Sequence, residues 1–286
     1  MKTLLKLVLV VLTTSFVGCR GIDPDLGIDV SDRANPWTGL NLYNNPDNFQ
    51  FAILADRTGG ARLGVFESAV GKLNLLKPEF VMCVGDLIEG YTEDESELDD
   101  QWDEIDSLVS KLQMPFFYLP GNHDISNDVM AQKWRMRYGR SYYHFTYRDV
   151  LFLCLNTEDP PASGISDKQI GYFESVLKAN RNVRWTVVFM HRPLWRADTG
   201  NWREFETLLA ARPYTVFAGH LHKYGKTVRN KRLYYILATS GGAPGGNDED
   251  FCWFDHVVWV TMTDNGPAPV NLLLEGVLDD EPCPKQ

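Results

Sequence analysis

Polar residues that can bind metals or transfer protons follow a series of short apolar runs in this chain of 286 residues. Each run has the length and composition of a buried strand, and each ends in Asp, Asn or His. Ligands bind at the carboxyl ends of strands in open α/β sheets, so we expect these clusters to lie close together. The clusters are Asp56, Gly85-Asp86, Gly121-Asn122-His123-Asp124, His191 and Gly219-His220-Leu221-His222.

The donor atoms in these clusters are a mixture of oxygen and nitrogen. Such a mixture is typical of Mn, Fe or Zn, whereas Ca is bound by oxygen atoms. The donors exceed what one metal site with an open position needs, so we expect two divalent cations bridged by Asp86. His220 and His222 alternate along an extended segment, so the backbone between them must be kinked if both face the cations. The predicted ligands are Asp56, Asp86, Asn122, His191, His220 and His222.

Simpler explanations exist for each residue taken alone, since a single histidine after a strand is more often structural than a ligand. Four of the six histidines fall within the clusters, which favours the metal-site hypothesis, and His144 and His256 are predicted to be structural. The chain lacks the glycine-rich motifs of nucleotide-binding turns and the G-x-S-x-G motif of serine hydrolases. These absences argue against both classes.

The motifs resemble, in type and order, those of calcineurin-like metallophosphoesterases. The resemblance spans residues 51–222 and rests on Asp56, GDLIE at 85–89, GNHD at 121–124, His191 and GHLH at 219–222. It implies an α/β fold, a four-layer βαββα sandwich in a single domain, with a dinuclear metal centre. By motif position, the first cation would be held by Asp56, Asp86 and His222. The second would be held by Asp86, Asn122, His191 and His220.

The chain departs from the family pattern at one ligand position. The family's first motif is Asp-x-His, whereas this chain has Asp56-Arg57-Thr58. Thr58 offers a hydroxyl group, which is a weaker donor than an imidazole, or leaves the position to water. The first cation is therefore predicted to bind less tightly than the second.

The expected activity is hydrolysis of a phosphate ester, as a phosphatase or phosphodiesterase, with metal-bound hydroxide as the nucleophile. His123 is predicted to protonate the leaving oxygen, and Glu89 to orient His123. Arg57 and Arg192 each follow a ligand and are candidates for binding phosphate, with ion pairs to surface acids as the alternative. Monoesterases, diesterases, pyrophosphatases and nucleases share these ligands, and the loops 195–202 and 241–252 are expected to distinguish them. A second hypothesis, favoured only by Thr58, is a phosphate-ligand or metal-binding pseudoenzyme.

Composition limits the choice of partner. Hydrophobic residues make up 44% of the chain, which suits one large domain with a sizeable core. The 28 Lys and Arg against 38 Asp and Glu give a net charge of -10, which argues against a nucleic-acid binder. A small phosphorylated substrate is compatible with this charge, because bound cations reverse the local field.

The N-terminal segment is predicted to direct export. Residues 1–18 combine a basic start, an apolar run and small residues, as secretory signals do, and the run is too short to span a membrane. Phe16-Val17-Gly18-Cys19 resembles a bacterial lipobox, so Cys19 is predicted to be the lipidated first residue of the mature protein. Ordinary signal cleavage nearby is the alternative. We expect a lipoprotein of the bacterial cell envelope, held to the membrane by its lipid and facing the periplasm or the surface.

The remaining chain divides into a tether at 19–48, a metallophosphoesterase domain at 49–276 and a tail at 277–286. The apolar spacing of Leu98, Trp102, Ile105, Val109 and Leu112 predicts a helix that begins at a Thr92–Glu95 capping box and stops before Pro115. Further helices are expected at 166–179 and 201–211, and several strands within 223–276. Cys83 and Cys154 are predicted to be inert buried thiols. Pairing of Cys252 with Cys283 is left open.

Overall fold

The computed structural model describes residues 45–159, 163–197, 200–243, 254–274 and 276–278. The chain divides into two units, Met1–Tyr43 and Asn44–Gln286. The first unit lies outside the described residues, so the predicted signal segment, Cys19 and most of the tether lie outside them too. Cys252, Cys283, the tail beyond 278 and most of the 241–252 loop are likewise outside the described residues.

The described part of the second unit contains two six-stranded sheets. The first sheet has the order β12-β11-β10-β1-β2-β3, with bounds Gly276–Leu278, Gly266–Leu273, His256–Thr263, Phe49–Leu54, Val81–Cys83 and Phe116–Phe117. The second has the order β4-β5-β6-β7-β9-β8, with bounds Tyr143–Tyr147, Val150–Leu155, Trp185–Met190, Tyr214–Ala218, Arg232–Ile236 and Gly225–Arg229. Strands β1, β2 and β3 run parallel to one another, as do β5, β6, β7 and β9, so the polar residues after several of them meet at one edge.

The two sheets pack face to face. Successive side chains of a strand point to opposite faces of its sheet, so an inner strand contributes to two hydrophobic cores. In β5, Phe152 packs into a core shared with Phe51 and Ile53 of β1, so this core lies between the sheets. The alternating residues of β5, such as Leu153, pack instead against helices α4–α6. Those of β1, such as Leu54, pack against α1–α3. Three hydrophobic cores therefore separate four layers, which confirms the predicted sandwich.

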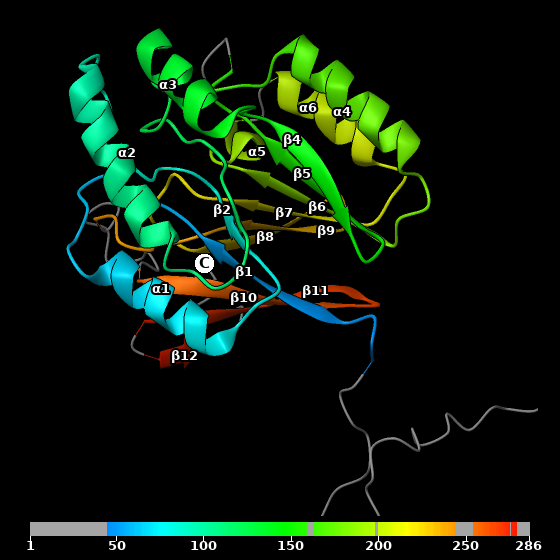
Figure 1. Cartoon of the computed structure of the whole chain (residues 1–286). Helices are drawn as coiled ribbons and strands as arrows, with labels where there is room; N and C mark the ends of the chain where they lie inside the picture. Colours follow the sequence, from blue (N-terminus) through cyan, green and yellow to red (C-terminus); the bar gives the residue numbers. More distant parts are fainter. Residues whose placement is uncertain (1–44, 160–162, 198–199, 244–253, 275, 279–286) are drawn as a thin grey trace, which may run out of the picture. The chain divides into compact units, whose positions relative to one another are not determined.

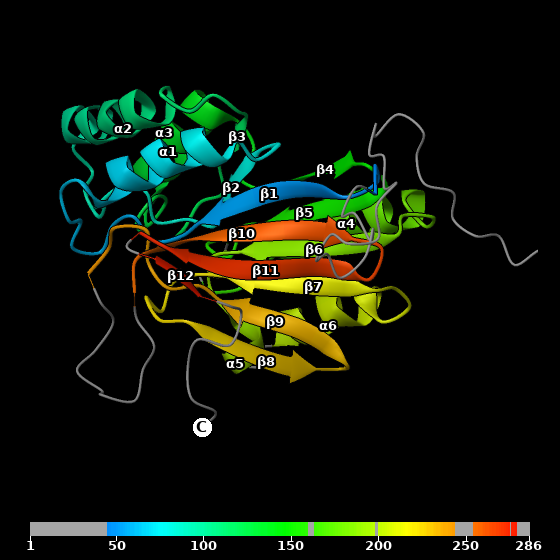
Figure 2. The ribbon, with the colours of Figure 1, turned by 90° about the horizontal axis from the view of Figure 1, so that it is seen from below.

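Helices cover the two outer faces (Figure 1). Beside the first sheet lie α1 (Val65–Leu76), α2 (Glu95–Val109) and α3 (Asp128–Tyr138). Beside the second lie α4 (Asp167–Ala179), α5 (Leu194–Ala197) and α6 (Gly200–Leu209). Figure 2 shows the first group of helices gathered near β2 and β3. None of the helices within the described residues is both long and apolar enough to cross a membrane.

Three details of the sequence prediction are corrected. The N-cap of α2 is Asp94, whose carboxylate accepts from the backbone N–H groups of Ser96 and Glu97, while Thr92 accepts from Asp94 N–H. Asp94 is the better cap because its negative charge also interacts favourably with the positive N-terminal end of the helix dipole. The predicted tether is too long, since residues 45–48 already contact the folded part, as when Asn45 donates to Asp264 (3.1 Å). Strand β12 also continues the first sheet past residue 276.

Candidate metal centre

Four of the six predicted ligands, which follow the ends of strands, adopt a backbone conformation that non-glycine residues rarely adopt. Such strain costs on the order of 1–3 kcal/mol per residue and tends to accumulate at functional sites. It also confirms the predicted kink in the GHLH segment, because both histidines there are affected. The residues with positive φ are Asp56 (52°), Asp86 (59°), His220 (73°) and His222 (52°).

Glycines in the motifs allow carboxylates to approach the backbone. A methyl group on Gly121 would lie 2.2 Å from Asp86 Oδ1, and one on Gly219 would lie 2.3 Å from Asp56 Oδ2. Neither distance is compatible with a side chain at these positions. The GNHD and GHLH motifs therefore need glycine because their turns pack against the two carboxylates.

Two groups of side chains can each hold a cation, and they share Asp86. One contains Asp86, His191 and His220, and the other contains Asp56, Asp86 and His222, with the potential ligand atoms of each within 4.8 Å of one another. Asn122 joins the first of these groups, since its Oδ1 lies 3.0 Å from His191 Nε2. The structure thus brings the six predicted ligands together in the partition that the motifs indicated.

Backbone carbonyls fix the orientation of three imidazoles. His191 Nδ1 donates to Val84 O (2.9 Å), and His222 Nδ1 donates to Ala243 O (2.5 Å). His123 Nδ1 donates to Glu89 O (2.7 Å). A carbonyl can only accept, so Nδ1 carries a proton in each ring and Nε2 faces the site. This is the arrangement expected of histidines that bind a metal or transfer a proton through Nε2.

The buried carboxylate of Asp86 forms an ion pair with His191. Its Oδ2 lies 3.1 Å from His191 Nε2, and neither side chain is appreciably exposed. Burial disfavours the charged form of Asp86, but the charge and hydrogen bond of His191 outweigh it and lower its pKa. Burial likewise opposes the charge on His191, but Asp86 raises the pKa of that histidine. A positive charge is therefore favoured beside Asp86 and Asn122, where the second cation is expected.

Asp56 and Thr58 leave buried oxygens without hydrogen bonds. Asp56 Oδ1 accepts from His220 N–H (2.9 Å), whereas Asp56 Oδ2 and Thr58 Oγ1 have no hydrogen-bond partner among the described residues. Burial raises the pKa of Asp56 well above its usual value. A buried carboxylate oxygen without a partner is costly, and a divalent cation would satisfy it. The donor set therefore fits a metal, and Thr58 lies fully buried where the family has a histidine.

His123 occupies the position expected of a proton donor, but Glu89 acts differently from the prediction. A methyl group on Gly59 would lie 3.7 Å from His123 Nε2 and 2.7 Å from the His222 ring, so Nε2 faces the metal groups. The carboxylate of Glu89 was predicted to orient His123. Instead it accepts from the N–H groups of Gly60 (3.1 Å) and Ala61 (2.8 Å), and the backbone carbonyl of Glu89 contacts His123.

Arg192 lies at the edge of the second ligand group. Its Nη1 donates to His220 Nε2 (2.8 Å), and its Nε donates to the buried carboxylate of Glu158 (2.6 Å). Burial, together with the charges of His191 and Arg192, lowers the pKa of His220 to about 3, so its ring is neutral. Glu158 therefore holds the Arg192 guanidinium against a predicted metal ligand, a role that sequence reasoning did not assign to Glu158.

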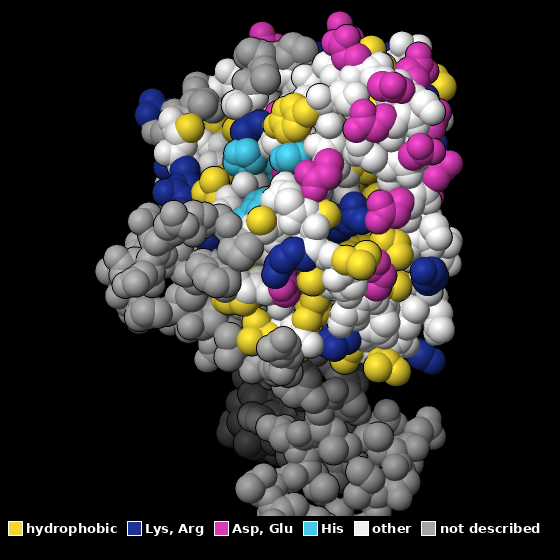
Figure 3. Space-filling model, turned by 90° about the vertical axis from the view of Figure 1, so that its left-hand side faces the viewer, with side chains coloured by type: hydrophobic (Ala, Val, Ile, Leu, Met, Phe, Trp, Pro, Cys, Tyr) yellow, Lys and Arg dark blue, Asp and Glu magenta, His cyan; other side chains and the backbone are white. Residues whose placement is uncertain are grey.

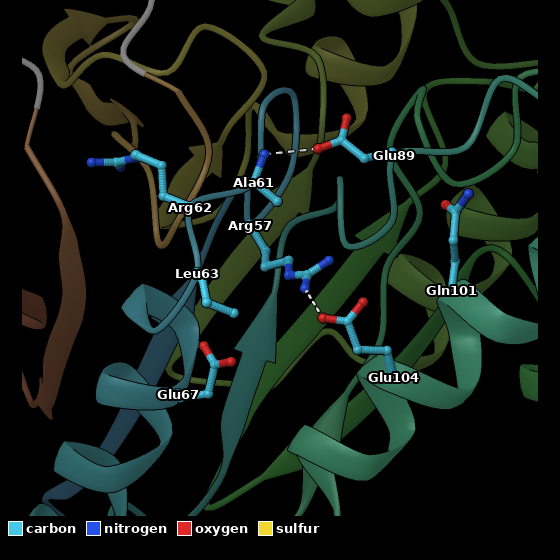
Figure 4. A pocket seen from close by; sticks show the side chains of 8 residues that line it. All are labelled: Arg57, Ala61, Arg62, Leu63, Glu67, Glu89, Gln101 and Glu104. Carbon is cyan, nitrogen blue, oxygen red and sulfur yellow. Dashed lines mark hydrogen bonds and ion pairs between the residues drawn. The ribbon is translucent and has the colours of Figure 1, made fainter.

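Arg57 is directed toward α2 and forms an ion pair with Glu104 (Figure 4). Its Nη1 also donates to the carbonyl of Leu87 (3.4 Å). The alternative considered for Arg57, pairing with an acid, is therefore the one observed. Arg57 and Glu104 both line a cavity of about 240 Å³. The residues that line it are Arg57, Ala61, Arg62, Leu63, Glu67, Glu89, Gln101 and Glu104.

Asp124, the last residue of GNHD, supports the site from behind. Its fully buried carboxylate accepts from the N–H groups of Gly121 (2.8 Å), Asp86 (2.7 Å), Leu87 (2.9 Å) and Ile88 (3.2 Å). It thereby ties the loop after β2 to the loop after β3. Its place in the GNHD motif is the sequence feature that could have singled out Asp124.

Three of the four histidines of the site, His123, His220 and His222, are partly exposed, whereas His191 is buried. Figure 3 shows cyan histidine side chains close together, with Lys or Arg beside them and acidic side chains gathered to one side. A substrate can therefore reach the candidate centre from solvent.

Comparison with known proteins gives a consistent result. A model of the calcineurin-like phosphoesterases matches residues 49–224. The serine/threonine-protein phosphatase CPPED1 of Bos taurus is 25% identical over 263 residues, which cover 82% of this chain and 77% of the relative. Two solved structures share the fold. Purple acid phosphatase PPD1 from yellow lupin (Lupinus luteus) has a TM-score of 0.63 at 13% identity, covering 81% of this chain and 53% of that one. GAP50 of Plasmodium, described as the anchor in the inner membrane complex, has a TM-score of 0.61 at 15% identity, covering 84% and 90%.

Proposed function

Because the chain belongs to the calcineurin-like phosphoesterase family, we propose that it is an enzyme that hydrolyses phosphate esters with two divalent cations. One observation carries this proposal. Two groups of buried or half-buried acidic and imidazole ligands share Asp86, and a histidine that is not a ligand candidate faces the same space. The first cation would be held by Asp56, Asp86 and His222. The second would be held by Asp86, Asn122, His191 and His220.

Bound cations would lower the pKa of a coordinated water and offset the negative charge of the phosphate oxygens. Proton transfer and further phosphate binding would depend on side chains of the protein. His123, held through Nδ1 by the Glu89 carbonyl, would deliver a proton from Nε2 to the leaving oxygen when both ring nitrogens are protonated, and would be left with its Nδ1 proton. Arg192, held by Glu158, would bind a phosphate oxygen at the edge of the second group. Arg57 has no part in this proposal, because its guanidinium is directed toward α2, where it pairs with Glu104, whereas that of Arg192 contacts a predicted ligand.

Thr58 favours a second candidate function, a protein that binds a phosphate ligand or a metal without turnover. The hydroxyl of Thr58 is a weaker ligand than the imidazole of the family motif, and Thr58 stands two residues after Asp56, which has a buried oxygen without a hydrogen bond. The intact His123 and the complete second group argue for the enzyme. The two candidates differ in one measurable respect, which is turnover in the presence of metal.

The test compares the wild-type protein with Asp86→Asn, using p-nitrophenyl phosphate with EDTA or Mn²⁺ and metal analysis of the purified proteins. Asp100→Asn is the matched control, because Asp100 is exposed on α2. We expect Mn²⁺-dependent turnover in the wild type and the control. Asp86→Asn should lower it at least about 100-fold, since both cations lose a charged ligand worth several kcal/mol in the transition state.

Metal binding without turnover on mono-, di- or pyrophosphate substrates would support the second candidate. Full turnover by Asp86→Asn, or by metal-free wild-type protein, would contradict the dinuclear proposal.

A further inference from the structure

Residues 89–91 form a segment that makes three separate contacts with Asn122 and His123. The Glu89 carbonyl accepts from His123 Nδ1. The Tyr91 ring meets the His123 ring edge-on, with centroids 4.7 Å apart and an interplanar angle of 76°. The Tyr91 hydroxyl oxygen accepts from Asn122 Nδ2 at 2.7 Å. One short segment thus contacts both a candidate metal ligand and the candidate proton donor.

The backbone of this segment is held in an unusual conformation. Gly90 and Tyr91 both have positive φ, 58° and 53°, and a methyl group on Gly90 would lie 1.7 Å from the His123 carbonyl oxygen. Tyr91 nevertheless remains 59% exposed, so burial of its ring does not account for the conformation. Gln101 of α2 accepts from Gly90 N–H (2.9 Å), and Asn127, the N-cap of α3, donates to Thr92 O (3.0 Å). Two helices therefore hold an exposed aromatic residue in a strained position.

We propose that Tyr91 is a positioning residue that keeps the Asn122 amide oxygen directed at the second cation and supports the His123 ring. Asn122 is buried, and its amide group has two ends of similar shape. Tyr91 engages Nδ2, which leaves Oδ1 beside His191 Nε2. Without the hydroxyl, the buried Nδ2 loses its partner and the amide is no longer held in this orientation. This inference rests on the proposed function, since it requires a cation at the second group.

Two substitutions separate the contributions of the hydroxyl and the ring. Tyr91→Phe keeps the ring beside His123 and removes the hydroxyl, whereas Tyr91→Ala removes both. Calorimetric titration of metal-free protein with Mn²⁺ should show one Mn²⁺ bound about tenfold more weakly in Tyr91→Phe, as is typical when a partner of a metal ligand is lost. Tyr91→Ala should show the same weakening. At saturating Mn²⁺ it should also lower kcat on phenyl phosphate more than on p-nitrophenyl phosphate, because only the poorer leaving group depends strongly on His123.

Tyr172→Phe is the matched control, because it removes a hydroxyl that lies 2.7 Å from Nδ1 of His144, a histidine outside the site. It should leave Mn²⁺ affinity and kcat unchanged. Unaltered Mn²⁺ affinity in Tyr91→Phe, with normal binding and turnover in the wild type, would overturn this inference alone. Failure of the wild type to bind Mn²⁺ would overturn the proposed function and the inference with it. An equal loss of affinity in the control would show a general effect of losing a tyrosine hydroxyl, and would also refute the positioning role.

Discussion

Protonation of His256 is expected to destabilise the fold in mild acid. His256 is fully buried at the start of β10, where its Nδ1 donates to Asn271 Oδ1 (2.8 Å). Its backbone carbonyl accepts from the hydroxyl of Ser240 (2.8 Å), and Ser240 Oγ in turn accepts from the N–H of Ala55, the neighbour of Asp56. Burial lowers the pKa of His256 to about 4, against an ordinary value of 6.5. A charge on this ring would therefore disturb residues that hold the first ligand.

The sign and size of the effect follow from proton linkage. Between pH 6.5 and 4 the unfolded chain binds a proton at this residue and the folded protein does not, so stability is complete above pH 6.5 and falls as the pH decreases. With these two pKa values, the free energy of unfolding falls by about 2 kcal/mol from pH 7.5 to 5, and by about 3 kcal/mol in total below pH 4.

The measurement is urea unfolding in EDTA at pH 7.5, 6 and 5 for the wild type and His256→Gln. Glutamine retains a donor for Asn271 and cannot gain a charge, so the advantage of the wild type over the variant should shrink by about 2 kcal/mol at pH 5. His144→Gln is the control, because His144 is only partly buried and its effect should be smaller. A difference between wild type and His256→Gln that stays constant from pH 7.5 to 5 would refute the reasoning.

Further predictions concern the site and the anchor. His123→Ala should retain both metals and lower kcat by about 10²–10⁴, with a smaller loss on p-nitrophenyl phosphate; an equal loss on every leaving group would argue against proton donation. One Mn²⁺ should remain bound through purification while the other exchanges with added metal. Thr58→Ala should reduce the affinity of the weaker site less than Asp56→Asn does. Two equally tight metals would contradict the prediction that the first group binds its cation more weakly. Glu158→Gln should raise KM by releasing Arg192, and an unchanged KM would exclude that support. We also propose that Cys19 is lipidated, so Cys19→Ser should move the protein from membranes to the soluble fraction; wild-type protein found wholly in the soluble fraction would disprove the anchor.

The fold was accessible from the sequence wherever one physical signal dominated. Continuous apolar runs such as 150–155 identified strands buried on both faces, and the structure has them as inner strands with cores on each side. The start of α2 was misassigned because Thr92 and Asp94 both suit a helix N-terminus, and only the backbone path decides between them. Strand β4 was not identified. Its aromatic residues alternate with polar ones and pack against the core between the sheets, but the strand is short and lacks the continuous apolar character of the inner strands.

The candidate site was likewise only partly predictable from the sequence. Its six ligand candidates were found because each stands at a strand end within a motif. Tyr91, Glu158 and the backbone carbonyl of Glu89 were not assigned their contacts, because each acts through a partner far along the chain. Glu158 meets Arg192 across 34 positions, and Tyr91 meets Asn122 across 31. Such contacts depend on how loops from different strands pack together, which residue spacing does not encode.

Several energetically unfavourable features of this fold meet at one edge of its sheets. Four ligand candidates adopt positive φ, an oxygen of Asp56 is buried without a hydrogen bond, and the like-charged Asp56 and Asp86 share one ligand group. Each feature alone costs free energy of folding, and none improves a hydrophobic core. A bound divalent cation would reverse the largest of these costs, because it supplies positive charge beside the two carboxylates and a partner for the unsatisfied oxygen. That these costs coincide with the family motifs is the strongest physical argument that this edge is the metal centre.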